Sequence, residues 1–388
     1  MRILHVIPTL NPAMGGPIEG VRTLFTYVNE GYIGEAVTAD LPDAPWLQGL
    51  AFPVHALGPS TGGTYGYNAR LLPWLRANID RFDGVIVNGL WQYNGLPAML
   101  AARGRKPYMV FTHGMLDPYF KRRYPLKHLK KVLYWYPFEY WVLRRAYRVL
   151  FTTETEERLA QESFAAWRWR PQVVPYGIRA PQSRPEDDIS TFLEHVPAVR
   201  GKRFLIYLSR IHPKKGCDLL LQAFSEVSAS DPDLHLVMAG PDETGWIPEL
   251  KAVAEKAGCG HRVHWPGILR GPAKWGAFRA AEAFILPSHQ ENFGIAVAEA
   301  LAAGLPVLLS DKVNIGDMLV GEGCSLIQPD TLDGTRHLLE SWIAMHPSDR
   351  QAMSEHAAEC FRSRFDMLET AQVIMSLFRQ AQLEGGKR

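Results

Sequence analysis

The residues best placed for chemistry follow a buried strand that we expect to end at Pro287. Glu291 lies in the polar turn after this strand, and Glu299 lies in a helix expected to begin near Gly294. Free amides at such a helix start, from Asn292 onward, attract phosphate, and each carboxylate can accept hydrogen bonds from two sugar hydroxyls. The pattern therefore indicates a site for a sugar and a diphosphate. The alternative is a pair of solvated glutamates on a helix face, where most glutamates lie.

A second polar turn follows another expected strand, which spans 203–210. The turn carries Arg210 and Lys215 and leads into a helix predicted over 218–229. A guanidinium and an ammonium group can neutralise the charge that develops on a departing nucleotide diphosphate, as a magnesium ion does elsewhere. Neither a metal ion nor another cofactor is therefore expected. The alternative is a basic loop on an otherwise acidic half of the chain.

Together these segments resemble the family-4 retaining glycosyltransferases of the GT-B fold, an α/β fold of two Rossmann-like domains that face each other across a cleft. The resemblance rests on Arg210, on Lys215-Gly216, on Glu291-Asn292-Phe293-Gly294 and on the run from Glu299 to Val307, with seven residues between the two glutamates. It implies that Arg210 and Lys215 contact the donor diphosphate. It also implies that Glu291 holds donor sugar hydroxyls, that Glu299 holds the ribose, and that the donor lies beside Asn292, Phe293 and Gly294.

The loop from Thr9 to Pro17 follows the first expected strand. It resembles the family's loop near the donor diphosphate and the acceptor, and backbone without side chains at Gly15 and Gly16 can approach a phosphate closely. The alternative is a plain tight turn. Asn88 and Trp91 end another strand, expected over 84–88, and we place them on the acceptor side with less support.

His113 ends the strand expected over 108–113 and precedes a glycine. The resemblance implies that its side chain contacts the donor sugar near the reacting carbon. A general base is one possible role. Retention in this family is usually explained by same-face attack in which the leaving phosphate helps to take the acceptor proton, so we assign His113 to positioning and electrostatics. The alternative is a structural histidine bonded to neighbouring backbone.

The segment 121–148 contains nine Lys and Arg residues and one acidic residue, Glu139, interleaved with aromatic residues. Such a segment could lie on an anionic bilayer, with rings at the headgroup level and cations over phosphates. The alternative is a helix whose aromatic face packs into the core and whose basic face is solvated. Pro137 interrupts the segment, so one continuous helix is not expected.

Composition is that of an ordinary soluble enzyme, with 47% hydrophobic and 21% charged residues. Residues 1–180 carry 21 basic and 13 acidic residues, whereas 181–388 carry 21 and 27, which argues against a nucleic acid partner for the whole molecule. The four cysteines have no paired spacing, and the first residues look like a strand rather than a signal peptide. We therefore expect a cytoplasmic protein, with peripheral attachment to the inner face of the membrane as a further option.

Short Val/Ile/Leu-rich runs alternate with amphipathic segments in both halves, which predicts two sheets of βα units. We place a first domain at 1–180, a Pro-rich and acidic linker at 181–200, and a nucleotide-sugar-binding domain at 201–366. A final helix over about 367–388 could pack back on the first domain. An Asp-x-Asp motif at Asp231 is expected to be a turn at the wrong end of the sheet, not a metal site.

We therefore predict a retaining, metal-independent hexosyltransferase. Its donor would be a UDP- or GDP-sugar and its acceptor a glycan or lipid-linked saccharide, in bacterial surface polysaccharide or lipopolysaccharide biosynthesis. A non-hydrolysing sugar-nucleotide epimerase, a pyridoxal-dependent sugar phosphorylase and a non-catalytic sugar-nucleotide-binding protein use the same fold and remain alternatives.

Overall fold

The computed structural model divides the chain into two compact units. It describes residues 1–388 except 15, 27–30, 124, 166, 228 and 386–388. The first unit comprises Met1–Gly177 and Met367–Arg388, and the second comprises Ile178–Asp366. The chain thus passes between the units twice, and its last helix belongs to the first unit.

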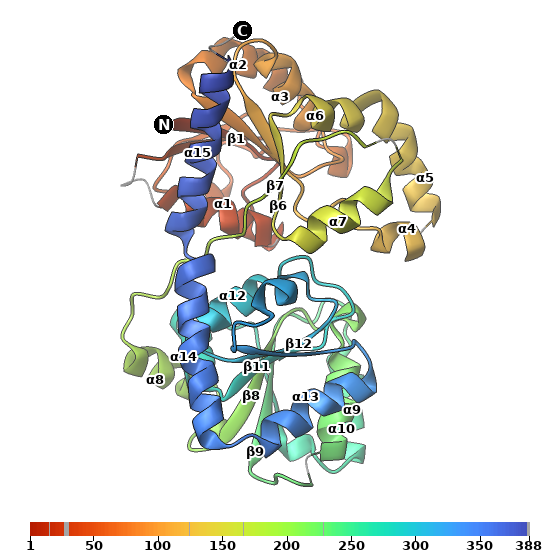
Figure 1. Cartoon of the computed structure of the whole chain (residues 1–388), viewed down its shortest axis with the longest axis vertical. Coiled ribbons are helices and arrows are strands. Elements are labelled where there is room, and N and C mark those ends of the chain that lie inside the picture. The colour runs from red at the N-terminus through yellow and green to blue at the C-terminus, as the bar shows by residue number, and fades with distance from the viewer. Residues whose placement is uncertain (15, 27–30, 124, 166, 228, 386–388) are drawn as a thin grey trace. The chain divides into compact units, whose positions relative to one another are not determined.

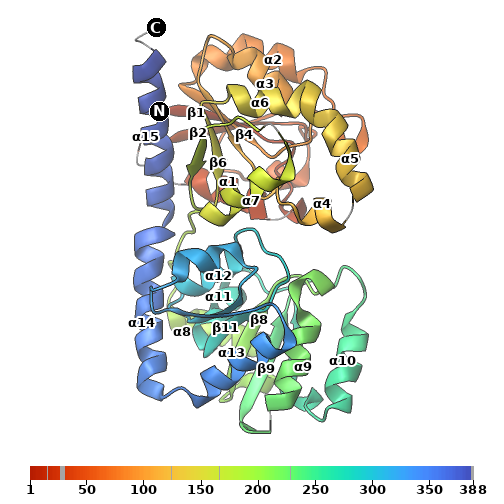
Figure 2. The ribbon, with the colours of Figure 1, turned by 45° about the vertical axis from the view of Figure 1, so that its right-hand side comes forward.

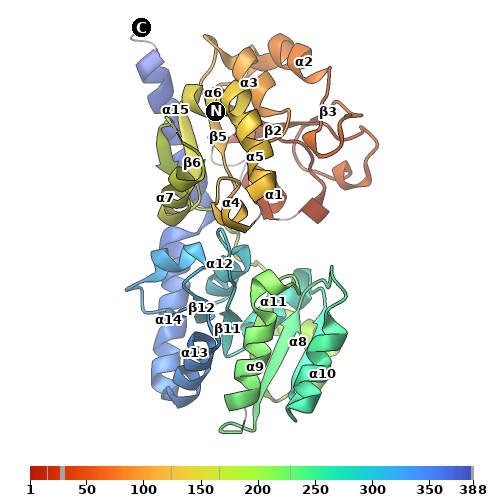
Figure 3. The same cartoon turned by 90° about the vertical axis from the view of Figure 1, so that its right-hand side faces the viewer.

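The first unit is built on a seven-stranded parallel sheet of order β3-β2-β1-β4-β5-β6-β7. Figure 3 shows β3 at one edge and β6 toward the other. Two of its strands were not predicted, because Gly34 and Glu35 interrupt the apolar pattern of β2 and β3 has only three residues. The strands are β1 (Arg2–Val6), β2 (Ile33–Thr38), β3 (Val54–Ala56), β4 (Gly84–Asn88), β5 (Tyr108–Phe111), β6 (Arg148–Phe151) and β7 (Pro171–Val173).

Helices cover both faces of this sheet, as the crossovers of parallel strands require. Ile18, Phe25, Ile374 and Phe378 pack α1 and α15 into one apolar cluster, and α2, α3, α6 and α7 contribute to the other. Figure 2 shows α15 on one side of the strands and α2, α3 and α6 on the other. The helices are α1 (Gly16–Thr26), α2 (Leu71–Asn78), α3 (Gly95–Ala102), α4 (Tyr119–Arg123), α5 (Pro125–Tyr134), α6 (Tyr140–Arg145), α7 (Glu154–Ser163) and α15 (Met367–Gly385).

The second unit has a six-stranded parallel sheet of order β10-β9-β8-β11-β12-β13, so the predicted pair of parallel α/β sheets is confirmed. The pattern had indicated every strand except β13, whose residues are only half-buried. The strands are β8 (Arg203–Leu208), β9 (Leu234–Ala239), β10 (Val263–Gly267), β11 (Ala283–Leu286), β12 (Val307–Ser310) and β13 (Ser325–Gln328).

Helices also cover both faces of the second sheet. Helix α9 contacts α10 and α13, whereas α8 contacts α11 and α12 contacts α14. Figure 1 shows α9, α10 and α13 together on one side of these strands, away from α14 and α8. The helices are α8 (Pro185–His195), α9 (Cys217–Val227), α10 (Ile247–Lys256), α11 (Gly271–Ala280), α12 (Ile295–Ala302), α13 (Leu332–Ala344) and α14 (Pro347–Arg364).

The segment predicted as a linker, 181–200, is not an exposed linker, because most of it forms α8 and packs on α11. Its acidic residues occupy the first turn of α8, where their negative charges stabilise the helix by interacting with the positive end of its dipole. Phe192 is fully buried, and Asp188 is buried in an ion pair with Arg279. The proline at 185 begins the helix instead of breaking it.

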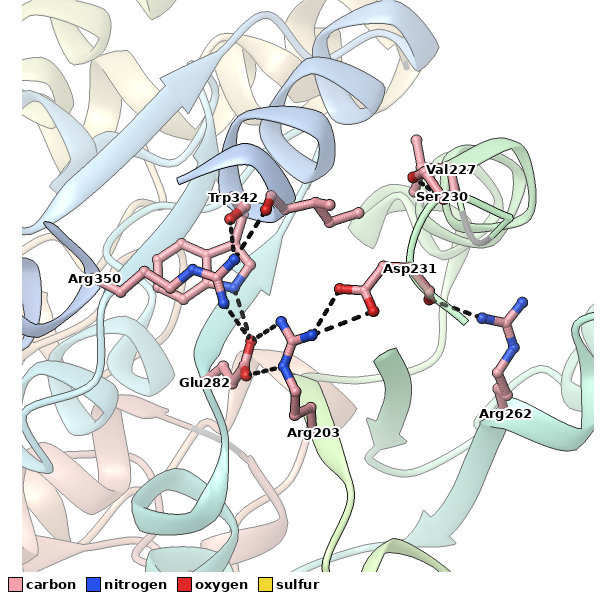
Figure 4. A network of polar contacts seen from close by, with 9 residues as sticks. Arg203, Val227, Ser230, Asp231, Arg262, Glu282, Trp342 and Arg350 are labelled. Carbon is pink, nitrogen blue, oxygen red and sulfur yellow. Dashed lines mark hydrogen bonds and ion pairs between the residues drawn. The ribbon is translucent and has the colours of Figure 1, made fainter. Parts of the chain in front are cut away.

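A polar network ties the amino-terminal edge of the second sheet together (Figure 4). Arg203, at the start of β8, bonds both carboxylate oxygens of Glu282 at 2.5 and 3.1 Å and those of Asp231 at 2.9 and 3.2 Å. Glu282 also accepts from Trp342 Nε1 at 3.3 Å and from Arg350 at 3.2 Å. Asp231 is therefore a member of this network. The Asp-x-Asp motif lies before β9, as predicted, and away from the carboxyl ends of the strands.

We expect Glu282→Ala to lower the free energy of unfolding by about 2 kcal/mol, because two half-buried guanidinium groups lose a shared carboxylate. The matched control is Asp333→Ala, which breaks the exposed Arg336–Asp333 pair and should change it by less than ~0.5 kcal/mol. Calorimetric melting of the three proteins measures both effects. Equal shifts in the two variants would contradict the assigned role of Glu282.

Candidate functional site

The carboxyl-terminal edge of the second sheet brings Lys215 and Glu291 together. Lys215 follows β8 and Glu291 follows β11, the neighbouring strand. The Lys215 ammonium donates to Glu291 Oε2 at 2.5 Å and to the carbonyl of Gln290 at 3.3 Å. Lys215 is only 5% exposed, so this is a largely desolvated ion pair at the place where open parallel sheets bind ligands.

Two glycines make this arrangement possible. Gly216 has a φ of 67°, and a Cβ there would lie 2.0 Å from the carbonyl oxygen of Pro287, so no other residue fits between the two loops. Gly294 has a φ of 79° and stands directly before α12. The loops after β8 and β11 therefore meet closely because glycine lies at both turns.

Arg210 lies in the same loop as Lys215 and is about half exposed. Its guanidinium donates to Glu243 at 3.1 Å, and its carbonyl accepts from the Tyr207 hydroxyl at 2.8 Å. Glu243 follows β9, the strand next to β8, and sequence reasoning did not propose it. Since this pair is exposed, an anion can compete for Arg210 at small cost.

Glu299 lies one turn into α12 and is 9% exposed. It accepts from the Lys274 ammonium of α11 at 2.6 Å. Lys274 was not predicted, because it lies 25 residues earlier on a helix that carries no motif. Both predicted glutamates thus carry a lysine partner, and each pair is neutral as a unit.

The residues after Glu291 differ in what they can offer a ligand. The backbone N–H of Asn292 donates to Glu291 Oε1 at 3.1 Å. This donor is therefore already used within the loop. Phe293 is 2% exposed and packs edge-on against Phe365, with ring centroids 6.0 Å apart. Its side chain belongs to the core, and only its backbone can face a ligand.

In the first unit, the described part of the chain has two non-glycine residues with left-handed φ, Trp91 at 67° and His113 at 51°. They follow the neighbouring strands β4 and β5 at their carboxyl ends. Such backbone is costly for residues with a Cβ, and it persists where surrounding contacts hold it, often at functional sites. Both residues had been singled out from the sequence.

The His113 ring lies beside two rings that are nearly parallel to it, and these two rings also lie 5.8 Å from each other. Phe111 is 5.2 Å away at an interplanar angle of 6°, and Tyr176 is 5.6 Å away at 4°. Nε2 bonds Asn88 Oδ1 at 3.2 Å, and Nδ1 contacts the Tyr176 hydroxyl. Burial lowers the pKa of His113 to about 3, so the imidazole is neutral at physiological pH.

The polar groups of Asn88 and Trp91 are already bonded within the first unit. Asn88 is only 3% exposed, and its amide is held between His113 and His5, so its side chain is not placed to contact an acceptor. The sequence could not show that the β1 histidine reaches the end of β4. The Trp91 indole donates to the carbonyl of Met115 at 3.1 Å and carries the Lys131 ammonium 4.7 Å above its ring.

Three buried carboxylates hold the loops at this edge, and none was predicted. Asp40 accepts from Thr9 Oγ1 at 2.5 Å and from the amide of Leu10 at 2.8 Å. Glu139 accepts from the amide of Trp91 at 2.7 Å.

Glu156 accepts from the amides of Gly114 and Thr152, both at 2.7 Å, and from two threonine hydroxyls. A sequence signal existed for Glu156, because Thr153 caps α7 and Thr-x-x-Glu is a capping-box pattern. In the structure, however, its carboxylate also reaches the loop that carries His113.

The glycine loop after β1 is described only in part. Gly16 is the first residue of α1, so its amide lies at a helix start as an anion site requires. Gly15 lies outside the described residues.

The segment 121–148 divides into an outward and an inward part. α5 has no buried residue, and Leu126, Leu129 and Leu133 are 80%, 58% and 72% exposed. Trp135 begins a π-helical turn that includes Pro137, and it is 1% exposed. The packing of Trp135 agrees with the alternative of an aromatic face in the core, while contact of the exposed leucines with a membrane stays a prediction. No helix in the described residues is long and apolar enough to cross a bilayer.

Two family models match the chain. One is described as glycosyl transferases group 1 and matches residues 189–359, and the other as a glycosyl transferase 4-like domain and matches residues 23–177. A D-inositol 3-phosphate glycosyltransferase of Segniliparus rotundus is 30% identical over 243 residues, which are 62% of this chain and 53% of that protein. The chain thus spans about half the length of this curated relative, and 39% of the like-named protein of Nocardia farcinica.

Solved structures share the fold over nearly the whole chain. Anabaena Alr3699/HepE in complex with UDP and glucose has a TM-score of 0.75 at 17% identity, with 98% of this chain and 100% of that chain covered. WaaG, a glycosyltransferase involved in lipopolysaccharide biosynthesis, has a TM-score of 0.64 at 18% identity, with 96% and 99% covered.

Stability should depend on the protonation of Glu139. Burial raises its pKa to about 7, although the bond from Trp91 opposes this. In the unfolded chain, a glutamate loses this proton near a pH of about 4.3. Between these two pKa values the folded state therefore binds more protons than the unfolded state, and the free energy of unfolding falls as pH rises, by up to about 4 kcal/mol.

Glu139→Gln should remove this fall, which thermal unfolding between about pH 5 and pH 8 would measure. Glu154→Gln, an exposed glutamate on the same unit, is the control and should melt as the parent does at every pH. Parallel pH profiles for the parent and Glu139→Gln would contradict the prediction.

Proposed function

Because the chain belongs to the glycosyl transferases group 1 family and has the two sheets of the GT-B fold, we propose that it transfers a sugar from a nucleotide-diphosphate donor with retention and without a metal ion. The observation that carries the proposal is the pair between the buried Lys215 and the half-buried Glu291 at the carboxyl edge of the second sheet. It combines a cation for phosphate with a carboxylate for sugar hydroxyls within one contact.

The donor diphosphate would bind Arg210 and Lys215. Arg210 would exchange the exposed Glu243 for phosphate oxygens, and Lys215 would keep Glu291 while its remaining N–H faces the phosphate. These cations would stabilise the charge that develops as the nucleotide departs. Glu291 would hold sugar hydroxyls, and Glu299, oriented by Lys274, would hold the ribose.

The neutral state of His113 supports a positioning role. A ring with a pKa near 3 carries no charge, so it can exchange hydrogen bonds with sugar hydroxyls without changing the net charge of the site. Retention would follow from same-face attack, in which the acceptor hydroxyl passes its proton to the departing phosphate. His113 then needs to hold the sugar and has no proton to abstract.

We favour a UDP-sugar as donor and a glycan or lipid-linked acceptor, in bacterial surface polysaccharide assembly. A solved structure of the same fold contains UDP, and another belongs to lipopolysaccharide biosynthesis. Buried, unbridged Cys217, Cys259, Cys324 and Cys360 suit a reducing cytoplasm. The exposed leucines of α5, beside Lys127 and Lys130, would suit contact with the anionic face of a membrane.

Donor use is tested by nucleotide release and transfer across a panel of UDP- and GDP-sugars with EDTA present. We expect one donor to be consumed by the parent, and Glu291→Ala and Arg210→Ala to lower kcat/KM by roughly a hundredfold or more. Lys251→Ala, an exposed cation on α10, is the control and should match the parent. Loss of all turnover in EDTA, or full activity in both site variants, would refute the mechanism. Binding without any turnover would favour a non-catalytic protein.

Membrane contact is tested by co-sedimentation with phosphatidylcholine vesicles, with and without phosphatidylglycerol. We expect binding only to the anionic vesicles, weakened by salt and abolished in the double variant Leu126→Asp with Leu133→Asp. The control is Val320→Asp, because Val320 is 71% exposed on the second unit. Equal binding to both vesicle types, or no effect of the double variant, would exclude α5 as the contact.

A further inference from the structure

A chain of hydrogen bonds connects His113 to the core of the first unit. His113 Nε2 bonds Asn88 Oδ1 at 3.2 Å, Asn88 Nδ2 bonds His5 Nδ1 at 3.2 Å, and His5 Nε2 bonds the Tyr32 hydroxyl at 2.5 Å. At its other end, His113 Nδ1 contacts the Tyr176 hydroxyl. Strands β1 and β4 are neighbours in the sheet, and this brings His5 beside Asn88.

The orientation of the Asn88 amide gives this chain a single direction. Asn88 Nδ2 lies 3.5 Å from the carbonyl of Ile86, and a carbonyl can only accept, so the amide nitrogen faces His5 and the amide oxygen faces His113. The oxygen requires a proton on His113 Nε2. The nitrogen requires a lone pair on His5 Nδ1, so the His5 proton is on Nε2 and is donated to Tyr32.

We propose that Asn88, His5 and Tyr32 are positioning residues that hold His113 in its Nε2–H tautomer and leave the Nδ1 lone pair as the acceptor at the surface of the site. The proposal rests on the proposed function in one respect, that a sugar hydroxyl would donate to Nδ1 in place of Tyr176. The tautomer itself can be tested whether or not the chain transfers a sugar.

Burial makes the chain of bonds uncharged and rigid. His5, Tyr32 and Asn88 are 1%, 0% and 3% exposed, so a reversed bond would leave a polar atom unsatisfied in the core. Burial, with a smaller contribution from His113, lowers the pKa of His5 to about 3, and burial lowers the pKa of His113 to about 3, so neither ring gains a proton near neutral pH. Tyr176 and the Glu156 carboxylate, which binds the next amide, also face the His113 loop.

The arrangement also explains why the contact to the sugar should come from Nδ1. Because Nε2 donates to Asn88, it is turned into the protein. Nδ1 carries the free electron pair and meets a hydroxyl already, that of Tyr176. A sugar hydroxyl offers the same donor, so it can replace the tyrosine without any change in protonation.

The direct test is long-range ¹H–¹⁵N NMR of histidine side chains in the full-length chain, with resonances assigned by His113→Gln and His5→Gln. The parent at pH 7 should show His113 and His5 as neutral Nε2–H tautomers. In Asn88→Asp, the carboxylate cannot donate to His5 and attracts a proton to His113, so we expect His5 to change tautomer or charge and the pKa of His113 to rise. A parent spectrum with His113 as the Nδ1–H tautomer, as a mixture or as a cation would overturn the proposal.

Two further variants distinguish an effect on the histidine tautomers from an effect of misfolding. Tyr32→Phe keeps the ring and removes only the acceptor of the His5 proton, so the His5 and His113 resonances should shift and broaden. Tyr67→Phe, at a 44% exposed tyrosine of the same unit, is the control and should leave both spectra unchanged. Unchanged His113 signals in both Asn88→Asp and Tyr32→Phe would show that the chain of bonds does not govern the ring.

Kinetics provide the second readout if a donor is found. With its pKa raised, His113 in Asn88→Asp is a cation below that pKa, so kcat should fall roughly tenfold or more at pH 7 and recover as pH rises, while KM changes little. A pH-independent loss would mean that Asn88 has only a structural role. If no donor is consumed by the parent, the proposed function fails while the NMR result still decides the tautomer.

Discussion

The loops at the carboxyl ends of parallel strands leave backbone groups without partners in the sheet, and both units depend on how these groups are satisfied. In the first unit, Asp40 and Glu139 each bind the backbone of one loop, and Glu156 binds the backbone of two. These anchors hold Trp91 and His113 in left-handed backbone that neither residue would adopt alone. Burial raises the pKa of Glu139 to about 7.

The two units handle charge in different ways at this edge. In the first, His113 is a neutral imidazole held by the Asn88 amide and the Tyr176 hydroxyl. In the second, lysine and glutamate side chains form the pairs Lys215–Glu291 and Lys274–Glu299. Each pair thus places a positive and a negative charge in contact, which offsets part of the cost of burying them.

The charged residues at the amino-terminal edge of the second sheet are bonded to one another. Arg203, Glu282 and Arg350 form a closed network of ion pairs there, which joins β8 and β11 to α13 and α14. Every charge has a partner within the protein. At the carboxyl edge, Arg210 pairs with the exposed Glu243, so an anion can displace this partner at small cost.

The sequence by itself determined the features that depend on residues close together along the chain. Apolar runs ending in polar turns located most strands, and the spacing around Arg210, Lys215, Glu291 and Glu299 identified the family. Local exceptions have local reasons, since Gly34 and Glu35 obscured β2 and a proline with acidic residues concealed α8. Only the tertiary structure decided the partners: Lys274 for Glu299, Glu139 for Trp91, and His5 for Asn88. These pairs are separated by 25 to 83 residues, and no local pattern records them, because packing of the sheet and its helices alone brings such side chains into contact.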